Sequence, residues 1–187
     1  MKGTEPMKGI NLMAAAGALF WLTGCASAPD FAIVRPVGPA PGSPAVASKQ
    51  GYVVVYTARQ QEPITANFTE WQREYNLGRY PVAYELAHTA YTIRREDGRI
   101  IEHVRNAKGP DDPQPKVVAL PPGRYQVEAE AQEPNGQMVS VILPVVVEPG
   151  KTTVAHLADQ WKPGTQFREA DVVRLPDGQI AGWMAQE

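Results

Sequence analysis

The clearest pattern of hydrophobic and polar positions lies between residues 124 and 131. Here Tyr125, Val127, Ala129 and Ala131 alternate with arginine, glutamine and glutamate. Alternation with a period of two is typical of a β-strand that has one buried face and one solvated face. The pattern therefore predicts a strand whose apolar side chains, Tyr125 and Val127 among them, point into a core while the residues between them face water.

Further apolar runs predict more strands, and turn sequences separate them. The expected strands cover residues 52–56, 91–94, 100–104, 117–120, 138–147 and 151–157. Asp97-Gly98 and Asn135-Gly136 stand between such runs, and these dipeptides favour hairpin turns. The continuous run Tyr52–Tyr56 predicts a strand buried on both faces. Pro144 cannot donate a backbone hydrogen bond, so we expect an edge position or a break there.

One segment interrupts the β pattern. Thr69 and Gln72 have the spacing of a helix-capping box, and Gly78 suits the end of a helix. We therefore expect a short helix over residues 70–77, inserted between strands. Helical spacing places Trp71 and Tyr75 on one face of it.

The last part of the chain, residues 159–187, predicts a small C-terminal hairpin. Two apolar runs, Val172–Leu175 and Gln179–Trp183, flank the turn sequence Pro176-Asp177-Gly178. We expect this extension to pack on the main domain through Trp161 or Trp183.

Six or seven short strands with frequent turns predict an all-β fold, an antiparallel β-sandwich over residues 50–158. Two stretches carry a resemblance: 120–127, LPPGRYQV, and 146–153, VVEPGKTT. They resemble motifs of the transthyretin-like sandwich that is related to carboxypeptidase regulatory domains. The resemblance implies an Ig-like or transthyretin-like fold, and it brings no catalytic residues with it.

The N-terminal segment has the order of a secretory signal peptide. Lys8 supplies positive charge, Leu12–Leu22 lacks polar residues, and small residues follow. The run is shorter than the ~20 apolar residues of a membrane-spanning helix. Because Met7-Lys8-Gly9 repeats Met1-Lys2-Gly3, translation starts at either Met1 or Met7. We expect residues 1–24 to be removed.

The end of this segment, Leu22-Thr23-Gly24-Cys25, resembles the lipobox of bacterial lipoproteins. The resemblance implies that Cys25 becomes the first residue of the mature chain and carries lipid, palmitate included, which anchors the protein to a membrane. Ala26 and Ser27 follow, with no aspartate of the kind associated with inner-membrane retention. By the same resemblance, a Gram-negative host would hold the protein at the outer membrane, facing the periplasm. Residues 25–49 are rich in proline and predict an extended tether.

Composition narrows the function classes. The net charge is −2, and no basic stripe indicates a nucleic-acid partner. The sequence contains 1 cysteine, the one in the lipobox, so a lipidated mature chain has no free thiol, disulfide or thiolate metal ligand. The 18 prolines and 16 glycines favour short strands over helices.

The sequence predicts no catalytic residue, no metal site and no cofactor. His88, His103 and His156 are far apart, and none belongs to an HExxH-like string. Asp111-Asp112 lacks the spaced carboxylates of a calcium loop. Neighbouring strands can still bring two histidines together, so an enzyme with an unrecognised carboxylate or histidine site stays open as the alternative function.

Aromatic residues are the main candidates for binding. The set is Trp71, Tyr75, Tyr80, Tyr84, Trp161 and Trp183. Such side chains either cap a small core or form an exposed patch that stacks on sugar rings or anchors a partner protein. We expect a membrane-anchored envelope lipoprotein whose sandwich is a non-catalytic binding or structural module. Its partner is an envelope protein or a cell-wall glycan, and Trp71 and Tyr75 are the predicted contacts.

Overall fold

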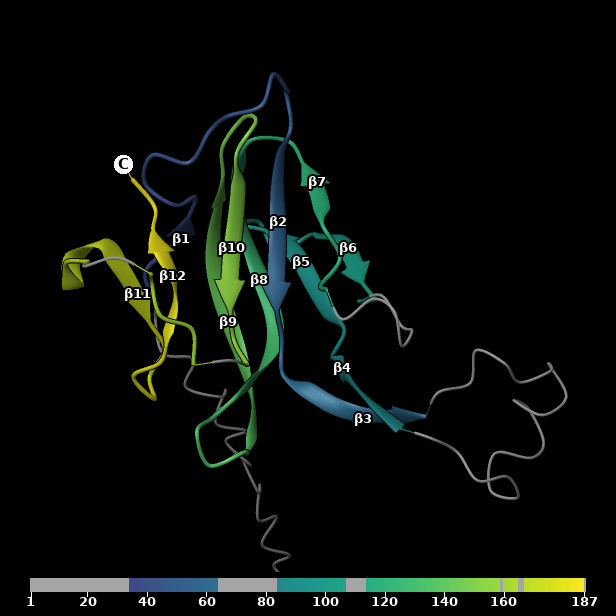
Figure 1. Ribbon diagram of the computed structural model, residues 1–187. Helices are drawn as coiled ribbons and strands as arrows, with labels where there is room; N and C mark the ends of the chain where they lie inside the picture. The colour runs from purple at the N-terminus through teal and green to yellow at the C-terminus, as the bar shows by residue number, and fades with distance from the viewer. Residues whose placement is uncertain (1–33, 64–83, 107–113, 159, 165–166, 187) are drawn as a thin grey trace, which may run out of the picture. The chain divides into compact units, whose positions relative to one another are not determined.

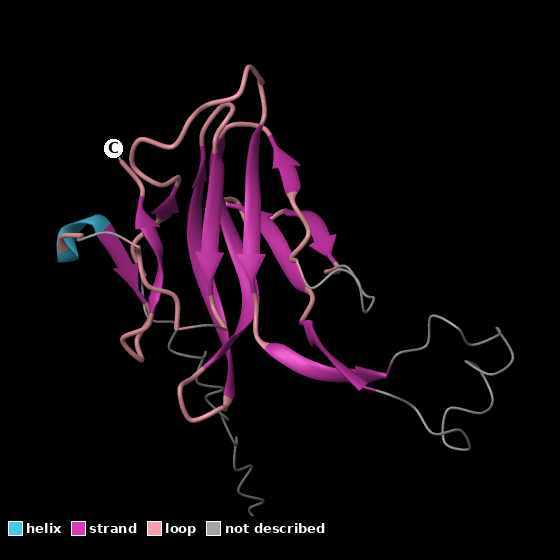
Figure 2. Ribbon diagram, in the orientation of Figure 1, coloured by secondary structure: helices cyan, strands magenta, loops and turns pink. Residues whose placement is uncertain are grey.

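A computed structural model describes residues 34–63, 84–106, 114–158, 160–164 and 167–186 (Figure 1). These residues form strands and loops, with a single short 3-10 turn, as Figure 2 makes clear. The all-β prediction is therefore confirmed, whereas the helix expected over residues 70–77 lies outside the described residues. In chain order the elements are β1 (Val37–Gly38), β2 (Gly51–Tyr56), β3 (Arg59–Pro63), β4 (Tyr84–His88), β5 (Tyr91–Arg95), β6 (Ile100–Val104), β7 (Val118–Leu120), β8 (Gly123–Gln132), β9 (Met138–Val147), β10 (Thr152–His156), η1 (Glu169–Asp171), β11 (Val172–Arg174) and β12 (Ile180–Met184).

The described strands form two main sheets and one strand pair. The large sheet has the order β11-β12-β1-β9-β8-β5-β6, and the small sheet has the order β10-β2-β7. Strands β3 and β4 pair only with each other. Most pairs are antiparallel as predicted, but β10 runs parallel to β2 and β1 runs parallel to β9. Parallel pairing needs a long connection, and each of these two pairs joins strands that are distant in the sequence.

The long hairpin β8–β9 forms the centre of the large sheet. Its pairing runs without interruption from Gly123 opposite Val147 to Gln132 opposite Met138. Tyr125 and Val127 are 4% and 0% exposed, while the side chains between them face outward. The predicted alternation is thus confirmed. The Tyr125 hydroxyl donates to the Pro121 carbonyl at 2.8 Å, which fixes the proline-rich turn before β8.

Two expectations about individual strands are wrong. Pro144 neither breaks β9 nor lies at an edge, because it pairs opposite Gln126 inside the large sheet. The sheet tolerates this proline because the neighbour on the other side, β1, pairs with β9 only at Val145. Strand β2 is buried on one face only: Val53 and its alternate neighbours are buried, and the intervening residues are half-buried.

The hydrophobic core lies between the two sheets. Val53 and Val55 of the small sheet share it with Ile93, Val127 and Leu143 of the large sheet. All five are 0% exposed. Continuous burial from both sheets is what a sandwich requires.

The N-terminal stretch corrects the predicted tether. Val37 is 0% exposed and pairs with both Met184 of β12 and Val145 of β9. Pro39 then bridges to Thr153 of β10, so this short stretch joins the large sheet to the small one. A two-residue strand between prolines has no readable periodicity, and its partners come from the other end of the chain. From Val34 onward the chain therefore belongs to the sandwich.

The predicted C-terminal hairpin is present as β11 and β12, which pair antiparallel. It is not a separate extension, however, because β12 pairs with β1 inside the large sheet. All described residues belong to one compact unit, Phe31–Glu187. The boundaries expected at residues 50 and 158 therefore do not divide the domain.

Candidate functional site

Five aromatic rings follow one another from β4, across β2 and β10 of the small sheet, to β12 of the large sheet. We call them the aromatic row; its members are His88, Tyr56, His156, Trp161 and Trp183. The three central rings are nearly parallel: Tyr56 and His156 have centroids 4.9 Å apart, and His156 and Trp161 have centroids 4.4 Å apart. The two end rings meet their neighbours edge to face, His88 at 5.7 Å and Trp183 at 6.0 Å.

Strand register places the first two stacked rings. β2 and β10 run side by side (Figure 1), and the parallel register sets His156 directly opposite Tyr56. Side chains opposite each other in neighbouring strands share a face of the sheet. Val55 and Ala155, one position earlier, point into the core and are 0% exposed. Tyr56 and His156 consequently lie on the outer face of the small sheet.

Trp161 covers the outer face at this point. It comes from the loop after β10, and its stacked ring leaves His156 only 7% exposed although that side chain faces away from the core. Trp161, Trp183 and Tyr56 themselves are half-buried. The row is thus a partly covered aromatic surface, and its two tryptophans remain accessible at its edge.

A buried hydrogen-bond network fixes the His88 end of the row. The Thr57 carbonyl can only accept, so His88 Nδ1 carries a proton and donates to it at 2.6 Å. Asn106 Nδ2 donates to the Thr89 carbonyl at 2.9 Å, and Thr57 Oγ1 donates to the same oxygen at 2.7 Å. These four side chains are at most 7% exposed. The hydrogen bond from His88 Nδ1 to the Thr57 carbonyl sets the orientation of the His88 ring at this end of the row.

The structure brings together some of the predicted candidates. Trp161 stacks on His156 of β10, as the predicted packing of the C-terminal segment on the main domain requires, and Trp183 contacts Trp161. Cys25, Trp71, Tyr75 and Tyr80 lie outside the described residues. His88 and His156 both contact Tyr56, while His103 lies elsewhere, with its Nδ1 3.0 Å from Thr92 Oγ1. Sequence reasoning missed Tyr56 because nothing in a β-branched strand reveals a parallel partner 100 residues later, from position 56 to position 156.

Titratable groups with shifted pKa values lie outside the row. On the surface, the hydrogen bond from Arg168 lowers the pKa of Asp171, and the hydrogen bond from Arg174 lowers the pKa of Glu169. In the interior, burial and then the nearby Glu102 carboxylate raise the pKa of Tyr91. Within the described ranges, no group of three or more His, Cys, Asp or Glu side chains is placed to hold a metal ion.

The described strands and their shared core define an all-β sandwich protein with an aromatic row on its small sheet. Comparisons with protein-family models, with curated proteins and with solved structures found no match for this chain. The part of the chain that the structure describes contains no helix with the length and hydrophobicity of a membrane span.

Proposed function

We propose that this protein is a lipid-anchored cell-envelope protein whose sandwich is a non-catalytic binding or structural module. The observation that carries the binding role is the aromatic row, in which half-buried Trp161 continues the stack of Tyr56 and His156 and half-buried Trp183 meets it edge to face. Aromatic faces of this kind stack on sugar rings and anchor protein interfaces. Because Tyr56, Trp161 and Trp183 are only half-buried, these members of the row are available to a partner without opening the core.

The anchor rests on the sequence. The ending Leu22-Thr23-Gly24-Cys25 has the lipobox pattern, and lipid chains contribute ~0.8 kcal/mol of membrane affinity per buried methylene. Cys25→Ser should therefore release the protein from membranes or leave its signal peptide uncleaved. Fractionation of cells that express both forms checks this. A Cys25→Ser protein that is processed and sediments with membranes as the parent does would contradict the anchor. In a Gram-negative host we place the protein at the outer membrane, facing the periplasm.

The binding role is tested with the full-length protein and isolated cell wall or crosslinked envelope partners. Trp161→Ala should abolish retention, since it removes the ring that links Trp183 to the rest of the row. Tyr52→Ala is the matched control, because Tyr52 lies on the same outer face of β2 but outside the row. Thermal unfolding of each variant separates lost binding from lost folding. Equal retention by both folded variants would contradict a binding role for the row.

Trp71 and Tyr75 remain proposed contacts on the segment expected to be helical. The double change Trp71→Ala with Tyr75→Ala should weaken retention while the melting temperature moves little. If the double variant instead melts much lower, these two side chains belong to the core. The row would then carry the binding alone.

A further inference from the structure

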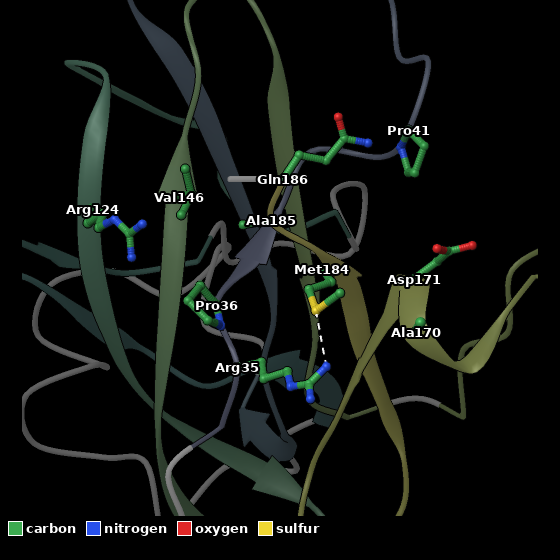
Figure 3. A pocket seen from close by; sticks show the side chains of 10 residues that line it. All are labelled: Arg35, Pro36, Pro41, Arg124, Val146, Ala170, Asp171, Met184, Ala185 and Gln186. Atoms are coloured by element: carbon green, nitrogen blue, oxygen red, sulfur yellow. Dashed lines mark hydrogen bonds between the residues drawn. The ribbon is translucent and has the colours of Figure 1, made fainter.

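A hollow of about 520 Å³ lies beside β12, β1, β9 and β8, which are successive strands of the large sheet. Figure 3 shows its lining side chains, which come from the segments just before and after β1, the start of β8, the end of β9, η1, and the end of β12 with the residues after it. Its floor is mainly proline and aliphatic, with Pro36, Val146 and Met184 at its centre. Ligand pockets in proteins have volumes of ~300–1,000 Å³ and combine apolar linings with a few polar groups.

The short strand β1 explains why the hollow exists. β1 has 2 residues and stands between β9, which has 10, and β12, which has 5. Before β1 begins, the chain stays attached to β12 through the Ala185 amide, which donates to the Pro36 carbonyl at 2.9 Å. Arg124 of β8 borders the hollow on the side away from β12. It pairs opposite Val146 of β9.

Two arginines give the hollow its charge. Figure 3 shows the Arg124 side chain directed toward Val146 and the Arg35 side chain directed toward Met184. Arg35 Nη1 lies 3.5 Å from the Met184 sulfur, and neither guanidinium has a carboxylate partner among the described residues. The lining carboxylate, Asp171, already accepts two hydrogen bonds from Arg168, at 2.9 and 3.1 Å. The hollow therefore offers uncompensated positive charge.

We propose that this hollow binds a carboxylate attached to a short apolar body. A guanidinium forms charge-assisted hydrogen bonds with a carboxylate, and the proline and aliphatic floor suits an apolar group beside it. An inorganic anion alone would leave the apolar floor uncovered. The free C-terminus of a short peptide and a small aliphatic acid both have this chemistry. The inference is independent of the lipid anchor and of the aromatic row.

Four probes distinguish the sources of the carboxylate. Titration calorimetry and amide chemical shifts would measure the binding of each probe separately. The probes are N-acetyl-alanyl-alanine, the same peptide with a C-terminal amide, hexanoate, and inorganic phosphate. We expect saturable binding of at least one carboxylate probe, with shifts at Val146 and Ala185. Preference for the acetylated dipeptide identifies a peptide C-terminus, and preference for hexanoate identifies an aliphatic acid. The C-terminal amide and phosphate should bind at least about tenfold more weakly than the better carboxylate.

Matched arginine variants test the site itself. Arg124→Gln and Arg35→Gln should each weaken binding of the carboxylate probe by about tenfold or more, since each removes a charged donor from the hollow. Arg105→Gln is the control, because Arg105 is also exposed but does not line the hollow. The three variants should unfold at nearly the same temperature as the parent.

Three results would overturn the proposal. The first is no saturable binding of either carboxylate probe by the folded protein. The second is equal binding of phosphate, which would show attraction by charge alone. The third is that the Arg124→Gln and Arg35→Gln variants bind the carboxylate as strongly as the Arg105→Gln control.

Discussion

The central hairpin β8–β9 and the place where β1, β10 and β12 meet are held together in different ways. The hairpin pairs along its whole length with residues that are close in the sequence. The second region, which we call the closing seam, consists of Val37–Pro39 with Met184, Trp183, Val145 and Thr153. Its partners are distant in the sequence, and the bridge between Pro39 and Thr153 joins the large sheet to the small sheet.

The hairpin and the closing seam contribute to the stability of the sandwich in different ways. A hairpin forms with little loss of loop-closure entropy, whereas each contact in the closing seam must first bring distant segments together. The hairpin therefore supplies most of the local order, and the seam links the two sheets along one side of the core. Damage to the hairpin should destroy the fold, while damage to the seam should loosen one side of it.

The largest expected effect comes from Val127→Asp in the central hairpin. Val127 is 0% exposed, so the change would place an unpaired charge in the core and should abolish cooperative folding. Circular dichroism and urea unfolding check this. Glu128→Gln is the control: it removes the exposed pair between Glu128 and Arg94, 2.9 Å apart, and should cost less than ~1 kcal/mol. Similar losses for the two variants would contradict the assigned faces of β8.

A smaller but still large effect is expected for Gly182→Ala in the closing seam. A Cβ at this position would lie 2.7 Å from Val37 Cγ1 and 2.8 Å from the Val154 carbonyl oxygen. The carbonyl belongs to the backbone of β10 and cannot move aside cheaply, so we expect a loss of about 3 kcal/mol in unfolding free energy. Hydrogen exchange should accelerate first at the Ala185 amide. Unchanged protection there would show that β12 does not depend on this close approach.

Gly136→Ala makes the same substitution in the turn of the central hairpin. Gly136 has φ of 85°, but a Cβ there would meet no atom within 4 Å. The cost is therefore conformational only, about 1 kcal/mol. Urea titrations of the two alanine variants side by side measure the difference between the regions. If Gly136→Ala proved the more damaging, the contrast between hairpin and seam would be wrong.

The smallest effect at neutral pH is expected for Tyr91→Phe on β5, beside the hairpin. The Tyr91 hydroxyl is buried without a hydrogen-bond partner among the described residues, so its removal should change stability by less than ~1 kcal/mol. Burial raises the pKa of Tyr91 in the folded protein. The unfolded chain loses this proton near pH ~10, so the contribution of Tyr91 is intact below that pH and declines above it. Tyr91→Phe should reduce the loss of stability between about pH 9 and 11; an unchanged loss would contradict the raised pKa.

The sequence predicted the parts of the fold that local chemistry determines. The alternation around Tyr125 and the turns at Gly98, Gly136 and Gly178 all appear where expected. The features of the fold that the sequence did not predict depend on pairing between segments that are distant in the chain. Val37 looked like part of a tether because two apolar residues among prolines give no period, and Pro144 looked disruptive because its short neighbour was unknown.

The candidate site divides in the same way. Trp161 and Trp183 stood out by residue type, and the prediction that the C-terminal segment packs through them pointed to the right region. The stack itself depends on the register that sets His156 opposite Tyr56, and a single sequence does not encode that register locally. Arg35 and Arg124 gave no signal at all, since exposed arginines are common and the hollow between them exists only in the folded chain.

The position of β1 limits the distance at which this domain can work. If Cys25 carries the lipid, only nine residue steps separate the anchor from Val34, where the chain already joins the core. Nine residues span about 30 Å when fully extended. A stalk that continued to residue 49 would instead reach on the order of 70 Å. The sandwich would therefore start within about 30 Å of the membrane surface, because its tether is much shorter than the proline-rich segment as a whole.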